Sequence, residues 1–165
     1  MFFEGRVDSA VKESARAVEL DSTLLATVNL VSMVNLAAGH PEVARRLIAI
    51  GFPVLAMSNG PYIYARLGDT ATAMRLVRAI EANNPRPWFA DVARASTMLA
   101  LGDTANALAG LERSDSATGG LWTVYLPVCD PAYDAIRHTP RFAALVRKAG
   151  LDTKVITAPR AVRAF

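Results

Sequence analysis

The residues able to perform catalytic or metal-binding chemistry are few and far apart in this chain. Two histidines, His40 and His138, lie in different segments, and neither has a carboxylate or cysteine at a spacing typical of metal ligands. The single cysteine, Cys129, excludes an internal disulfide and a multi-cysteine metal site. No nucleophile with an adjacent base can be assembled from the sequence. We therefore expect a protein that is not an enzyme and binds no cofactor or metal.

Asp69 and Asp103 resemble a pair of catalytic carboxylates until their surroundings are compared. The peptide Gly-Asp-Thr-Ala occurs twice, beginning at Gly68 and at Gly102, a step of 34. A glycine can adopt the left-handed conformation that ends a helix. The aspartate after it can accept hydrogen bonds from the free N–H groups that open the next helix. The repeated peptide therefore predicts two bends between helices, with the aspartates as caps.

The same step recurs elsewhere in the chain. It also separates Trp88 from Trp122, whereas the step between Gly39 and Gly68 is 29. An alanine where two helices cross lets them approach closely, and single helix pairs must stack because one pair cannot bury its apolar face. Four glycines are each followed five residues later by such an alanine: Gly5 and Ala10, Gly39 and Ala44, Gly68 and Ala73, Gly102 and Ala107.

With these glycine–alanine pairs and the exit turn Leu20–Asp21, the chain resembles the tetratricopeptide repeat family. Repeats of that family have a period of about 34 residues. The resemblance covers residues 1–116 and implies an all-α fold, a TPR-like superhelix of antiparallel helix hairpins whose first repeat is incomplete. Short capping helices are expected within 117–150, and a basic tail at 151–165. The stretch 130–146 is similar to the ending of such modules in large bacterial signalling proteins.

Prolines and glycines set the expected helix boundaries. Pro41, Pro53 and Pro87 suit first-turn positions. Gly60–Pro61 interrupts one expected helix, which either begins at Pro61 or is kinked there, because an interior proline lacks the N–H and clashes with the preceding turn. Asp130–Pro131 and Thr139–Pro140 are each a cap residue followed by a first-turn proline. The expected helices are 6–20, 23–38, 41–50, 53–67, 70–83, 86–101, 104–114, 131–137 and 140–149.

The resemblance also implies a binding surface, the concave face formed by the leading helix of each repeat. The side chains at the family's groove positions are mostly apolar or small, which favours an extended peptide or a partner helix. The other interpretation is that several of them only pack against neighbouring repeats. We expect a protein-interaction scaffold or adaptor, free or at the C-terminal end of a larger regulatory protein. The groove residues are Asn29, Met33, Ser58, Tyr62, Arg66, Phe89, Val92 and Ser96.

Positive charge is concentrated at the C-terminal end. From Arg137 onwards seven basic residues accompany one acid, although the whole chain is only +3. The tail could attach electrostatically to an acidic partner or to anionic lipid through Lys154, Arg160 and Arg163. The alternative function is therefore a structural accessory subunit of a larger, membrane-associated complex. The incomplete first repeat could also drive self-association, whereas nucleic-acid binding is disfavoured because aromatic residues do not interleave with the basic ones.

The sequence shows neither a signal peptide nor a membrane span. The opening MFFEGR has no long apolar region, and the longest apolar stretch, Leu24–Ala38, is short and interrupted by polar residues. We expect a cytoplasmic protein, with peripheral attachment to a membrane complex as the alternative.

Overall fold

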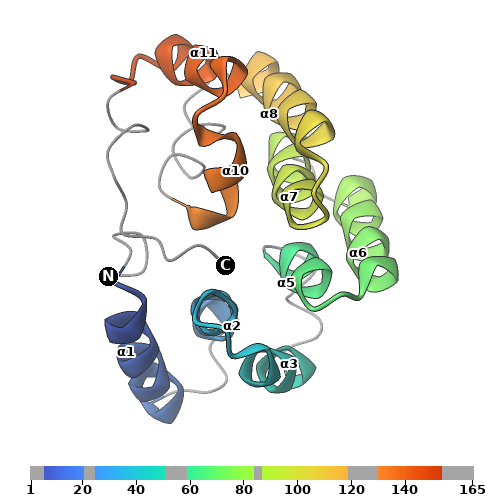
Figure 1. Ribbon diagram of the computed structural model, residues 1–165. Helices are drawn as coiled ribbons and strands as arrows, with labels where there is room; N and C mark the ends of the chain where they lie inside the picture. Colours follow the sequence, from blue (N-terminus) through green and yellow to red (C-terminus); the bar gives the residue numbers. More distant parts are fainter. Residues whose placement is uncertain (1–5, 21–24, 51–58, 84–86, 119–129, 154–165) are drawn as a thin grey trace.

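Every described element of the computed structural model is helical, which confirms the all-α class (Figure 1). The structure describes residues 6–20, 25–50, 59–83, 87–118 and 130–153, and no strand occurs among them. The elements are α1 Val7–Leu20, α2 Leu25–Ala37, α3 Pro41–Ile50, α5 Gly60–Arg66, α6 Thr70–Asn83, α7 Pro87–Ala100, α8 Thr104–Thr118, the 3-10 helix η2 Pro131–Tyr133, α10 Asp134–Arg137 and α11 Pro140–Lys148.

The helix boundaries follow the prolines and glycines of the sequence. Helices α3 and α6 begin and end where the sequence predicts, and α8 continues to Thr118. Helix α5 begins at Gly60 with Pro61 in its first turn, where a missing N–H costs no hydrogen bond. The sequence-predicted residues 53–58 of that helix lie outside the described residues.

Successive helices pack side by side and follow an arc (Figure 1). Helix α1 packs on α2, α2 on α3, α5 on α6 and α7 on α8, while α2 and α7 both contact α5. Helices α2, α5 and α7 lie on the inside of the arc, and α3, α6 and α8 lie on the outside. We call the surface of α2, α5 and α7 on the inside of the arc the inner face.

The bends between helices are closed by glycines in the left-handed region. At Gly68, with φ of 84°, the glycine N–H donates to the carbonyl of Ala65 at 3.0 Å, and the next N–H donates to the carbonyl of Tyr64 at 2.9 Å. The same pair of bonds recurs at Gly39, Gly102 and Gly150, whose φ values are 79°, 82° and 77°. This is the Schellman arrangement, and it confirms the predicted bends.

Aspartates open the helices that follow two of these bends. An Oδ1 atom of Asp69 accepts the N–H of Thr72 at 3.0 Å, and Asp103 accepts the N–H of Asn106 at the same distance. These hydrogen bonds lower the pKa of both carboxyls, mainly through the Thr72 N–H at Asp69 and the Asn106 side chain at Asp103. The interpretation of the two aspartates as helix caps is confirmed.

Small residues sit where paired helices approach most closely. Ala44, Ala73 and Ala107 are completely buried. In the α7–α8 pair a Cβ added to Gly110 would meet the carbonyl of Asp91 at 3.4 Å. A methyl group there would be in ordinary contact with the facing backbone, so the two helices lie close together at Gly110.

The C-terminal residues 130–153, which we call the cap, pack against α7 and α8. Asp130 accepts the N–H of Ala132 at 2.9 Å, and Thr139 accepts the N–H of Phe142 at 3.2 Å. Both residues thus cap the N-terminus of a helix, as the sequence predicts. One shared hydrophobic cluster joins the cap to the α7–α8 pair. It includes Leu108 and Leu111 of α8 and Tyr133, Ile136, Phe142, Leu145 and Val146 of the cap.

Candidate interaction site on the inner face

The predicted groove residues differ in how accessible they are. They lie on α2, α5 and α7, except Ser58, which is outside the described residues. Asn29 and Met33 of α2 and Ser96 of α7 are buried. Arg66 is exposed, whereas three others are half-buried: Tyr62, Phe89 and Val92.

The groove position of α2 is used for packing between helices. Met33 belongs to a buried cluster with Ile63 of α5, and its Sδ accepts a hydrogen bond from Asn59 Nδ2 at 2.8 Å. On α7, Phe89 packs towards Ile80 of α6. Its ring also meets the ring of Trp88 edge to face, with the centroids 5.9 Å apart. These contacts agree with the interpretation that some groove positions serve packing between repeats.

The cap covers two of the groove positions on α7, Val92 and Ser96. The hydroxyl of Tyr133 donates to the carbonyl of Val92 at 3.2 Å, and the ring is only 2% exposed. Ser96 lies beside the same hydroxyl and opposes the rise of its pKa, which burial drives far above the ordinary value of 10.0. The inner side of α7 is therefore occupied by a side chain of this protein.

Helix α5 carries the one exposed groove residue among those described, Arg66, beside the half-buried Tyr62. The Tyr62 hydroxyl is hydrogen-bonded to Arg66 one turn later on the same helix. Burial raises the pKa of Tyr62, Arg66 opposes that rise, and the carboxylates of Asp130 and Asp134 add to it. Tyr62 therefore lies within electrostatic reach of the cap. We call Tyr62 and Arg66 the inner-face site.

The described cations of the cap are largely paired within the protein. Arg137 is buried and its Nε donates to Asp134 at 2.7 Å. Arg141 binds Glu112 of α8 through two bonds of 2.8 Å, which lower the pKa of the glutamic acid, and Lys148 pairs with the buried Asp115. Two of the seven predicted basic residues, Arg141 and Lys148, thus fasten the cap to α8. The tail residues Lys154, Arg160 and Arg163 lie outside the described residues.

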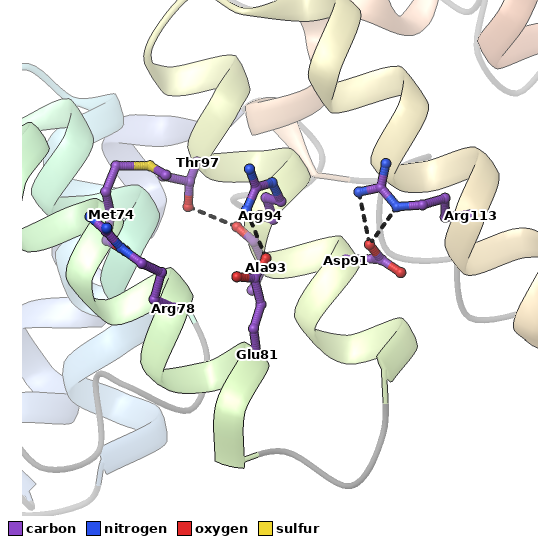
Figure 2. A network of polar contacts seen from close by, with 8 residues as sticks. All are labelled: Met74, Arg78, Glu81, Asp91, Ala93, Arg94, Thr97 and Arg113. Atoms are coloured by element: carbon purple, nitrogen blue, oxygen red, sulfur yellow. Dashed lines mark hydrogen bonds and ion pairs between the residues drawn. The ribbon is translucent and has the colours of Figure 1, made fainter.

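Ion pairs also join the helices that follow α5 (Figure 2). Arg94 of α7 binds Glu81 of α6 at 2.8 Å. Arg113 of α8 binds Asp91 of α7 at 3.0 Å. These cations are neutralised by neighbouring helices, so they add little net charge to the surface, and as partly exposed pairs each contributes at most about 1 kcal/mol to stability.

The N-terminal helix presents a charged surface. The exposed residues of α1 and of the position before it include both signs in similar number: Arg6, Asp8, Lys12, Glu13, Arg16 and Glu19. A dimer contact through this helix would have to desolvate these charges. Self-association through the incomplete first repeat remains a prediction.

The described part of the chain contains neither a group of metal ligands nor a membrane-spanning helix. No three side chains among His, Cys, Asp and Glu come together there as metal ligands, and none of its helices has the length and apolarity needed to cross a bilayer. His40 and His138 are both exposed. No protein-family model matches the chain, and no curated protein or solved structure is significantly similar to it.

Proposed function

We propose that this protein is a tetratricopeptide-like interaction module that binds a peptide or a helix of a protein partner on its inner face. The glycine-closed bends at Gly68 and Gly102 and the buried alanines after them support this proposal. Stacked hairpins place equivalent positions side by side, which suits recognition of an elongated partner. In this proposal the protein works in the cytoplasm and catalyses no reaction.

The pair formed by the half-buried Tyr62 and the exposed Arg66 is the observation on which the proposal depends. Asn29 and Met33 of α2 are buried, Tyr133 engages Val92 and Ser96 of α7, and Arg66 of α5 is exposed, so α5 offers the more open part of the inner face. Tyrosine and arginine are among the residues that most often dominate the binding energy of protein interfaces. We therefore place the centre of the contact at α5.

Site-specific photo-crosslinking tests the proposal. A photoreactive phenylalanine analogue replaces Tyr62 on the inner face or, as the control, Arg78 on the exposed side of α6. We expect one protein partner to be crosslinked from position 62 and not from position 78. Equal crosslinking from both positions, or crosslinking from position 78 alone, would overturn the assignment of the inner face.

A further inference from the structure

Three exposed arginines from three helices lie near the bend between α5 and α6. Arg45 of α3 donates from Nη2 to the carbonyl of Leu67 at 3.3 Å, which brings its guanidinium to the bend. Arg66 is the last residue of α5. Arg75 of α6 acts on the pKa of Asp69, the cap residue in the bend. We call Arg45, Arg66 and Arg75 the arginine cluster.

The fold itself does not require these arginines. The bend at Gly102 has the same left-handed glycine and the same two closing bonds as the bend at Gly68. At the equivalent positions around the Gly102 bend, counted from the glycine of each repeat, the chain has no cation: Met74 of α6, Ala100 of α7 and Ala109 of α8. A cation near a helix C-terminus is favourable, but the second bend forms without one at these positions. The cluster therefore calls for an explanation beyond closure of the bend.

Two arginines of the cluster are not neutralised by a carboxylate of the described part of the chain. Within the described residues neither Arg45 nor Arg66 forms an ion pair with a carboxylate, whereas Arg94, Arg113 and Arg141 each do. The guanidinium group binds carboxylates through two parallel hydrogen bonds. These two arginines thus have the chemistry to receive acidic side chains.

We propose that the arginine cluster docks an acidic segment of the protein partner, beside the inner-face site. This inference rests on the proposed function, and it assigns the partner a carboxylate-rich segment next to the part that contacts α5. A protein is favoured over nucleic acid or a lipid surface because the cluster is confined to a single bend. Those ligands bind extended basic surfaces, with stacking aromatics for single strands.

The test uses a fluorescent peptide of alternating glutamate and leucine, and the same peptide with glutamine in place of glutamate. The full chain is compared with the triple variant R45A/R66A/R75A. The matched control K12A/R16A/R147A removes the same number of exposed positive charges elsewhere. We expect the triple variant to bind the glutamate peptide roughly tenfold or more weakly, the control to bind as the parent does, and the glutamine peptide not to bind. Circular dichroism melting verifies that each variant is folded.

Several outcomes would overturn the inference. If the triple variant and the control lose affinity for the glutamate peptide equally, net charge alone attracts the peptide. No binding of the glutamate peptide to the parent would mean that the cluster is an ordinary solvated surface. If the triple variant instead loses binding to phosphatidylglycerol vesicles or to an oligonucleotide, the ligand is not a protein. The photo-crosslinking at position 62 is a separate measurement. It can support the inner-face site when the peptide experiment contradicts the arginine cluster, and the peptide experiment can support the cluster when the crosslinking contradicts the inner-face site.

Discussion

The hydroxyl of Tyr133 donates a hydrogen bond to the carbonyl of Val92 at 3.2 Å, although the two lie 41 residues apart in the sequence. This bond seats the cap on the inner side of α7, at a position where the sequence predicts contact with a partner. The protein thereby closes one end of its own inner face. The open part of that face is left to α5, where Tyr62 and Arg66 lie.

Removing the Tyr133 hydroxyl should destabilise the protein modestly. The Tyr133→Phe variant keeps the buried ring but leaves the Val92 carbonyl without this donor, so we expect a loss of about 1 kcal/mol in the free energy of unfolding. Urea denaturation measures it. The Tyr62→Phe variant is the control, since Tyr62 is half-buried, and it should lose less. A Tyr133→Phe variant as stable as the parent would show that the bond contributes nothing.

Stability should fall in alkaline solution because of Tyr133. Burial raises the pKa of this phenol in the folded state above its ordinary value of 10.0. Above pH 10 the unfolded chain releases this proton while the folded protein retains it, so the free energy of unfolding decreases as the pH rises. Urea denaturation between pH 8 and pH 11 should show a shallower decline for Tyr133→Phe than for the parent. Identical pH profiles would contradict this expectation.

The alanine in the α7–α8 crossing should not tolerate a larger side chain. Ala107 is completely buried, so Ala107→Leu should destabilise the protein by roughly 1–3 kcal/mol or more through overpacking. Ala105 lies on the same helix and is exposed, and Ala105→Leu should change the stability by less than about 0.5 kcal/mol. Thermal and urea unfolding of the two variants give the comparison, and similar losses would show that close approach of the helices is unimportant.

The left-handed glycine at Gly102 offers a test of backbone strain without steric contact. No atom lies within 4 Å of a Cβ built at this residue, so only the positive φ opposes a substitution. We expect Gly102→Ala to lose about 1 kcal/mol, and Gly102→Asn to lose less because asparagine visits this conformation more readily. The order of the urea midpoints checks this, and a more stable alanine variant would rule out the explanation.

Much of the local structure could be predicted from the sequence because it depends on short-range chemistry. The glycines at Gly39, Gly68 and Gly102 and the aspartates after two of them determine bends through bonds within a few residues. The cap residues Asp130 and Thr139 act in the same way. Periodicity then places the alanines at the helix crossings, without knowledge of any distant contact.

The accessibility of the groove was harder to predict because it depends on distant contacts. Periodicity says nothing of where the chain returns after the last repeat, so the covering of Val92 and Ser96 by Tyr133 was missed. One signal was present, since Tyr133 and Ile136 are three residues apart in a short capped helix, a spacing typical of a buried face.

The burial of Asn29 and Met33 had its own signal in the sequence. The apolar residues of Leu24–Ala38 leave no clear polar side on the helix, and α2 is buried along most of its length. A helix that is apolar nearly all round packs on several sides. The pattern therefore favours packing of α2 between its neighbours over an open groove.

The central claim is that the partner binds at the inner-face site, and isothermal titration of the crosslinked partner against purified variants tests it most directly. Tyr62→Ala on the inner face is compared with Arg78→Ala on the exposed side of α6. We expect Tyr62→Ala to weaken binding roughly tenfold or more, and Arg78→Ala to leave the affinity unchanged. Equal affinities for both variants, or a loss confined to Arg78→Ala, would contradict the claim.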